Sequence, residues 1–189
     1  EDRLEGERLK LRLAAGAAAL LLFTLDRLFD GVWLTLAIAV LAAAYAYSTH
    51  LIGVRLLGPI AVALASLVAL RLFISRELWF DDRTLPLGQH WPLYAYGVPA
   101  VLFLIASRWL KAAGHFRSSV ALEGISLGLA MSLVSLELRV LIAGGIGSDE
   151  PSLLEMAAHF LTWMAAAYGL MYRQHFYSSF ISLWGSRAL

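Results

Sequence analysis

Two long runs of the sequence contain no Asp, Glu, Lys or Arg. They extend from Gly31 to Val54 and from Thr84 to Ser107. A helix needs about 20 consecutive, predominantly apolar residues to cross the hydrocarbon core of a bilayer, and each run is long enough. The two runs therefore predict membrane-spanning helices.

The composition of the whole chain also indicates that the protein lies in a lipid bilayer. Hydrophobic residues make up 60% of the 189 residues and charged residues 15%, whereas soluble domains average about 45–50% and about 25%. This apolar excess excludes a soluble globular domain and a disordered chain. The net charge of +1 excludes nucleic-acid binding through a strongly basic surface. The absence of Cys excludes disulfides, thiolate metal sites and thiol nucleophiles.

Six apolar segments are long enough to span when charges at their ends are tolerated. They cover residues 11–29, 32–50, 56–75, 92–110, 118–143 and 152–172. The sequence thus predicts an all-α fold, a polytopic transmembrane helix bundle with about six spanning helices. Between the third and fourth segments, Arg76 to Trp91 is expected to be re-entrant or to lie on the membrane surface.

The last residues, Phe176 to Leu189, are apolar but shorter than the spanning minimum of about 17 residues. We expect them to begin a seventh span or to form an interfacial helix. We therefore interpret residues 1–189 as one integral-membrane bundle that is a fragment of a larger protein.

Lys and Arg side chains favour a cytoplasmic N-terminus. They are more frequent at the segment ends that this orientation places inside, as at Arg3, Arg12, Arg108, Lys111 and Arg117. Positively charged loops stay in the cytoplasm, so the bias predicts orientation. The chain is therefore expected to be an integral membrane protein with its N-terminus in the cytoplasm.

Small residues predict one close helix contact. Gly124 and Gly128 form a G-x-x-x-G pattern in the fifth segment. This spacing lets two spanning helices approach closely, so we expect the two glycines to lie at a helix–helix interface.

The ionisable residues inside the spans are the candidate functional residues, because charges are costly in hydrocarbon. In the fifth and sixth segments these are Glu137, Arg139, Glu155 and His159. Glu137 and Arg139 are two residues apart and face opposite directions, whereas Glu155 and His159 are four apart and share a face. No catalytic motif, cofactor site or metal site is expected, since no nucleophile pattern or set of three metal ligands is evident.

A hairpin of the fifth and sixth segments brings these residues to similar depths. Counted in residues from the hairpin loop, Arg139 lies at a depth similar to that of Glu155. Glu137 lies at a depth similar to that of His159. We expect these two pairs across the hairpin, and Arg139 has to meet a carboxylate, a carbonyl or water because its charge cannot be shed.

A cytoplasmic N-terminus puts the hairpin residues in the outer half of the membrane, where two further ionisable side chains also fall. The candidate outward-facing polar pocket consists of Asp26, Arg71, Glu137, Arg139, Glu155 and His159. It could bind a charged ligand or relay a proton, or it could act as polar glue between helices.

Three segments resemble one family of bacterial membrane proteins. They are Ser135-Leu136-Glu137-Leu138-Arg139, followed by Gly144-Gly145, Glu155 and Trp163, together with Asp30 to Ala37 and Tyr94 to Ala100. The family is the one grouped as domain of unknown function 2339. The resemblance implies a bacterial membrane location and a larger bundle, because members are much longer, and it implies no chemistry. One departure is that the acid expected in the second span is replaced by the apolar stretch Ala37 to Ala44.

Two function classes remain open from the sequence. The favoured one is a non-enzymatic protein of the cell envelope, either transporter-like or scaffolding, whose partners are the lipid bilayer, the remaining helices of the same protein and another envelope protein, but no nucleic acid. The alternative is a membrane-embedded enzyme that acts on an envelope lipid or glycan through Glu137, Arg139, Glu155 and His159. Full pairing of these side chains would favour the scaffold, and an unpaired acid in a solvent-reaching cavity would favour transport or catalysis.

Overall fold

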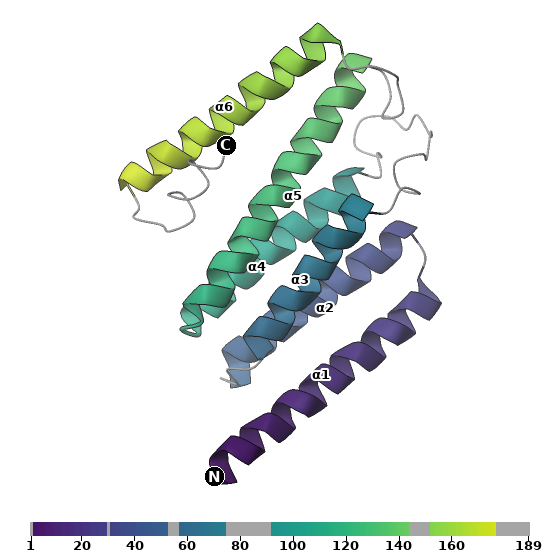
Figure 1. Cartoon of the computed structure of the whole chain (residues 1–189), viewed down its shortest axis with the longest axis vertical. Coiled ribbons are helices and arrows are strands. Elements are labelled where there is room, and N and C mark those ends of the chain that lie inside the picture. The colour runs from purple at the N-terminus through teal and green to yellow at the C-terminus, as the bar shows by residue number, and fades with distance from the viewer. Residues whose placement is uncertain (1, 30, 53–56, 75–91, 144–151, 177–189) are drawn as a thin grey trace.

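The computed structural model describes residues 2–29, 31–52, 57–74, 92–143 and 152–176, and nearly all of these residues are helical. The α-helices are α1 (Asp2–Leu28), α2 (Gly31–Ile52), α3 (Leu57–Ile74), α4 (Val98–Ala112), α5 (Phe116–Ala143) and α6 (Leu153–Phe176), and a π-helical turn, η2 (Leu93–Gly97), leads into α4. Consecutive helices run in alternating directions (Figure 1). The predicted all-α fold is confirmed, and the described ranges contain no strand.

Four helical segments are long and apolar enough to cross a membrane. By length and composition these are Gly31–Ile52, Leu57–Ile74, Leu93–Ala112 and Phe116–Ile142. The chain is therefore a membrane protein. The helices α1 and α6 overlap the first and last predicted segments. That these two helices cross the membrane stays a prediction. The predicted seventh segment after Phe176 and the predicted surface segment at Arg76 to Trp91 lie outside the described residues.

The core lies between α2, α3, α4 and α5 and consists largely of small side chains. Ala39, Ala42 and Ala46 on α2, and Ala61 and Ala65 on α3, are all buried. Small side chains let helix backbones approach closely, which matters in a bilayer because lipid tails remove most of the hydrophobic drive for helix association. Larger side chains fill the remaining space, namely Leu72, Tyr96, Phe103, Leu110, Leu122 and Leu129.

Polar side chains add one hydrogen bond at several of the helix contacts. The Tyr45 hydroxyl on α2 donates to the carbonyl of Ala14 on α1 at 3.2 Å. The Tyr96 hydroxyl in η2 donates to the Leu72 carbonyl on α3 at 3.2 Å. Ser126 on α5 donates to the Ala100 carbonyl on α4 at 2.6 Å. Bonds of this kind contribute about 0.6 kcal/mol on average in a membrane, so they refine the packing that the small residues permit.

The glycine pattern on α5 does not serve the expected contact. The buried side chains on this helix recur at steps of three and four residues, at Ser119, Leu122, Ser126, Leu129 and Leu136. Gly124 and Gly128 lie on the other side and are exposed, and a Cβ atom at either would meet no described atom within 4 Å. The prediction of a close glycine contact is therefore wrong for the part of the chain that the structure describes, because α5 packs through a different face.

The turn between α4 and α5 is closed by a glycine in the left-handed conformation. Gly114 has φ +80°, and its N–H bonds to the Lys111 carbonyl at 3.1 Å while the His115 N–H bonds to the Leu110 carbonyl at 2.8 Å. These two bonds form the Schellman motif that ends many helices. The tight turn places the end of α4 directly beside the start of α5.

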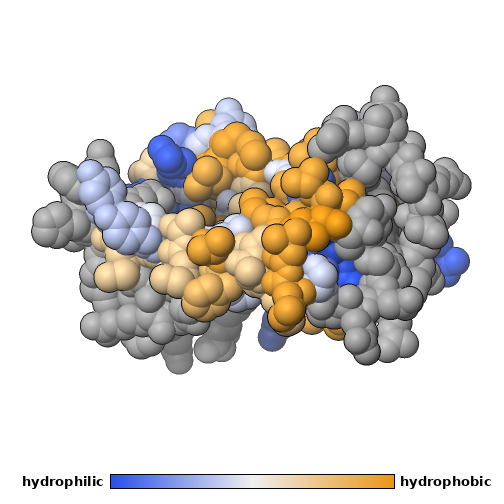
Figure 2. Space-filling view, turned by 90° about the horizontal axis from the view of Figure 1, so that it is seen from above, coloured by the Kyte–Doolittle hydropathy of each residue, from blue (hydrophilic) through white to orange (hydrophobic). Residues whose placement is uncertain are grey.

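The outside of the helices is largely apolar. Seen from above, hydrophobic residues dominate the described surface, and hydrophilic residues form separate patches (Figure 2). Large side chains such as Trp33, Val40, Leu70, Val101 and Leu141 are exposed. Such a surface is unfavourable in water and matches the hydrocarbon of a bilayer.

Candidate functional site

The candidate site lies where α6 meets α5. The two helices approach each other at the end where their connection lies and diverge toward the other end of α6 (Figure 1). Ser135 and Arg139 are one helical turn apart on α5, so they share a face. On that face the indole Nε1 of Trp163 on α6 donates to the Ser135 hydroxyl at 3.3 Å. This contact identifies the Ser135 and Arg139 side of α5 as the side that faces α6.

Three ionisable side chains meet at this junction. The Arg139 Nε atom and the His159 Nε2 atom each lie 3.7 Å from the Oε1 atom of Glu155. The Glu155 side chain is only 4% exposed, whereas those of Arg139 and His159 are each 29% exposed. The predicted pair of Arg139 with an acid is present. We call these three residues the junction cluster.

The distances in the junction cluster indicate charge attraction more than direct hydrogen bonding. A charge-assisted N–H···O bond is usually about 2.7–2.9 Å long, so 3.7 Å is too long for one. A buried carboxylate is costly unless positive groups compensate it. The junction cluster supplies this compensation from α5 through the Arg139 guanidinium, and the His159 imidazole lies beside the carboxylate on α6 itself.

The start of α6 is built to hold Glu155. The backbone N–H of Glu155 donates to the hydroxyl of Ser152 at 3.1 Å. This is an N-cap contact, and the sequence Ser152-Leu153-Leu154-Glu155 has the S-x-x-E pattern of a capping box. A carboxylate in the first turn of a helix is also favoured by the helix dipole. Sequence reasoning missed Ser152, although this pattern could have identified it.

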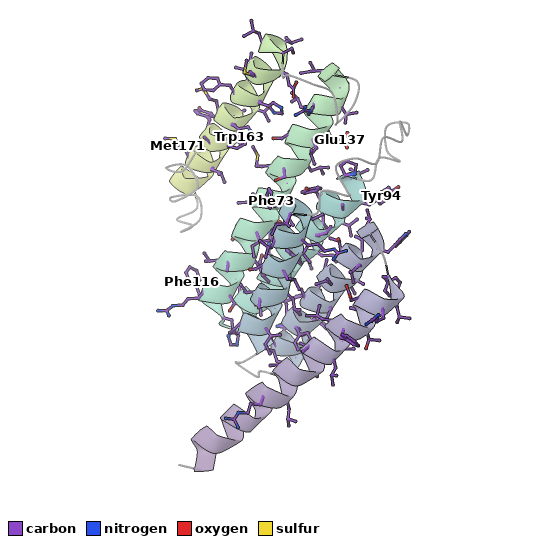
Figure 3. All side chains as sticks on the ribbon, turned by 45° about the vertical axis from the view of Figure 1, so that its right-hand side comes forward. Phe73, Tyr94, Phe116, Glu137, Trp163 and Met171 are labelled. Carbon is purple, nitrogen blue, oxygen red and sulfur yellow. The ribbon has the colours of Figure 1, made fainter. Side chains whose placement is uncertain are left out.

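Glu137 lies on a different side of α5 from the junction cluster. It is two residues, or about 200°, from both Ser135 and Arg139, and it follows directly after the buried Leu136. Figure 3 shows α6 with Trp163 on one side of α5 and Glu137 on the other. The structure therefore does not bring Glu137 to His159 as expected, because the partner of His159 is Glu155 on its own helix.

The two remaining candidates lie on other helices. Asp26 is exposed near the end of α1, beside Arg27, whose guanidinium lies 5.3 Å from the centre of the Phe23 ring. Arg71 is near the end of α3, where its Nε atom is buried and has no hydrogen-bond partner among the described residues. The contacts that define the junction cluster join only Arg139, Glu155 and His159. Of the six candidates, the structure brings together three.

The chemistry available to the junction cluster is limited by its residue types. It contains one carboxylate, one guanidinium and one imidazole, with neither a thiol nor a hydroxyl among the three. In the described part of the chain, no group of three or more His, Cys, Asp or Glu side chains could hold a metal ion. The arrangement can hold two helices together.

Comparisons of the chain with models of protein families, with curated proteins and with solved structures found no match.

Proposed function

We propose that this membrane protein has a non-enzymatic scaffolding role in the bacterial cell envelope, and that the junction cluster fastens α6 to α5. The observation that carries the proposal is the burial of the Glu155 carboxylate between Arg139 and His159 at 3.7 Å from each. Removing one partner of such a group leaves a buried charge without compensation, so the group resists separation of the two helices.

The pairing of Glu155 favours scaffolding over transport. A carboxylate that binds a transported ion or relays a proton has to be reachable from water in at least one state. The Glu155 side chain is nearly fully buried and has a positive group on α5 and an imidazole on α6. Glu137, the other acid near this end of α5, faces away from the junction cluster. The two acids therefore do not form one site.

The surface of α6 supports a role in assembly. Among the described residues, α6 packs mainly against α5, and it exposes Leu154, Phe160, Leu161, Met164 and Tyr168. A helix with this surface needs lipid or further helices around it. We propose that it contacts lipid, other helices of a longer protein, or another envelope protein.

The proposed location is the bacterial inner membrane with the N-terminus in the cytoplasm. The excess of Lys and Arg at one set of helix ends supports this orientation. The resemblance to the family grouped as domain of unknown function 2339 supports the bacterial membrane location, and membership of that family is part of the proposal.

Orientation can be tested by labelling single cysteines, because the chain has none of its own. We expect Thr84→Cys to react with an impermeant maleimide on intact cells and Gly114→Cys to be protected. Labelling of Gly114→Cys with protection of Thr84→Cys would reverse the orientation.

The scaffolding role can be tested with a crosslink between α5 and α6. The double variant S135C/W163C places two thiols where Ser135 and Trp163 are in contact, and a short bifunctional thiol reagent can join them in membranes. Adding Glu155→Gln should lower the crosslink yield several-fold, because the neutral side chain no longer attracts Arg139. Adding Glu137→Gln is the matched control and should leave the yield unchanged, because Glu137 faces away from α6.

Two outcomes would contradict the scaffolding role. One is an unchanged yield with Glu155→Gln, which would show that the junction cluster does not hold the helices and would favour a proton or ligand role for the acid. The other is an equal loss with Glu137→Gln, which would show a general effect of acid removal on the fold.

A further inference from the structure

A second charged region lies at the opposite end of α5 from the junction cluster. Here α2 ends, α4 ends and α5 begins, at the end of the bundle that also holds the N-terminus of α1 (Figure 1). Phe116, the first residue of α5, marks this end in Figure 3. The region contains His50 on α2, Arg108 and Lys111 on α4, His115 in the turn, and Arg117 on α5. We call these five residues the basic end.

The positive charges of the basic end point outward. Arg108, Lys111 and Arg117 are exposed, as is His50, and His115 is half-buried. The tight turn at Gly114 keeps Lys111 and Arg117 close along the chain. The three Lys and Arg groups therefore form one cationic surface at a single helix hairpin.

The helix ends that carry these charges contain no acid of their own. The last turns of α2 and α4 contain no Asp or Glu, and the first turn of α5 contains no acidic residue either. The next acid on α5 is Glu123, six residues after Arg117, which is about 9 Å along the helix. Arg108 and Lys111 are three residues apart on one face of α4, and like charges at this spacing repel each other. These three helix ends therefore contribute no carboxylate to the basic end.

An aromatic pair lies beside this surface. The rings of Tyr47 on α2 and Trp109 on α4 have their centres 5.0 Å apart. Tyr and Trp collect at the boundary between hydrocarbon and headgroups because they are apolar with one polar atom. Trp109 lies between Arg108 and Lys111 in the sequence, and His50 follows Tyr47 by three residues. We therefore expect the charged groups at or just beyond that boundary.

We propose that the basic end binds anionic phospholipid headgroups of the membrane leaflet that faces it. Headgroup phosphates are suitable counter-charges for the exposed Lys and Arg groups, and attraction to an anionic surface is worth about a fivefold change in affinity for each Lys or Arg near it. This property is independent of the junction cluster, which lies at the other end of α5.

The experiment uses the full chain in vesicles of phosphatidylcholine with a small amount of spin-labelled lipid. Electron paramagnetic resonance then compares the association of spin-labelled phosphatidylglycerol with that of spin-labelled phosphatidylcholine. We expect a several-fold preference for phosphatidylglycerol, a reduced preference in R117Q, and equal association in R108Q/K111Q/R117Q. Thermal unfolding in phosphatidylcholine alone should be unchanged by these substitutions, because all three side chains are exposed.

The matched control is Arg27→Gln, which removes an exposed positive charge at the end of α1 away from the basic end. It should leave the lipid preference unchanged. Equal association of the two lipids with the unaltered chain, or a loss in R27Q as large as that in R117Q, would overturn the proposal. Displacement of the spin-labelled lipid by millimolar inorganic phosphate would also overturn it, because the surface would then bind free phosphate instead of a lipid surface.

Discussion

The four-helix core and the α5–α6 junction are held together in different ways. In the core, buried alanines such as Ala42 and Ala65 let α2 and α3 pack closely, with Phe103 and Leu129 filling the remaining space. At the junction, α6 contacts α5 through the junction cluster and the Trp163–Ser135 hydrogen bond, while most of its large apolar side chains are exposed. Helix packing in the core thus depends on the fit of side chains, whereas helix packing at the junction depends on contacts between charged and polar groups.

This difference follows from the solvent. In a bilayer, apolar side chains gain little by leaving lipid for protein, so only close packing or polar contacts hold helices together. The core has enough small residues for close packing, and α6 has a few polar residues at one end. The effect of a substitution on stability should therefore depend on the change in side-chain volume in the core and on the change in charge at the junction.

The largest effect is expected from shortening a core side chain. Phe103 is 0% exposed, and Phe103→Ala should lower the free energy of unfolding by about 3–5 kcal/mol because it leaves a cavity. The matched change on α6, Phe160→Ala, removes a side chain that is 65% exposed and should change stability little. Denaturation in detergent micelles, followed by circular dichroism, measures both variants. Similar losses for the two would show that α6 is packed as tightly as the core.

A smaller loss is expected from removing one charge of the junction cluster. Arg139→Leu leaves the buried Glu155 carboxylate with His159 alone among its described partners. Breaking a fully buried pair costs about 3–5 kcal/mol, and because Arg139 is partly exposed we expect a smaller loss of about 1–3 kcal/mol. The double variant R139L/E155L should recover much of this loss, since no buried charge remains. A double variant that is no more stable than R139L would show that the pair does not act as a unit.

The smallest effects are expected from removing single interhelical hydrogen bonds. Trp163→Phe removes the donor to Ser135, and Ser126→Ala removes the donor to the Ala100 carbonyl. Each should cost about 0.6 kcal/mol and at most about 1.7 kcal/mol. The loss should be greater for Ser126→Ala, because its 2.6 Å bond is buried in the core. A greater loss for Trp163→Phe would mean that the indole contributes to the junction by more than its hydrogen bond.

The sequence predicted the positions of the helices because apolar length is a local property. Each described α-helix overlaps one predicted segment, although α1 begins at Asp2 and the first predicted segment begins at residue 11. The breaks at Gly31 and Gly114 contain the two glycines with positive φ. Depth in the membrane is also nearly local, since it follows from counting residues outward from a hairpin loop. That counting correctly matched Arg139 with Glu155.

Rotation of each helix about its own axis was not predictable in the same way. Pairing Glu137 with His159 requires the Glu137 side of α5 to face α6, and the helix instead turns its Ser135 and Arg139 side toward α6. The exposed position of Gly124 and Gly128 has the same cause, because α5 packs through a different face. An apolar helix in lipid has no strong polar and apolar sides in its sequence, so the pattern of residues does not fix its rotation.

The alanines of the core have a consequence for motion. Alanine has no side-chain rotamers, so packing Ala39, Ala42, Ala61 and Ala65 costs no side-chain conformational entropy. Where these alanines pack, α2 and α3 therefore have fewer alternative side-chain arrangements than a contact made of long side chains would have. The long side chains at the junction, such as Arg139 and Trp163, each have several rotamers. Slow rearrangement of the bundle should therefore begin with α6 changing its tilt on α5 while the alanine seam keeps its geometry.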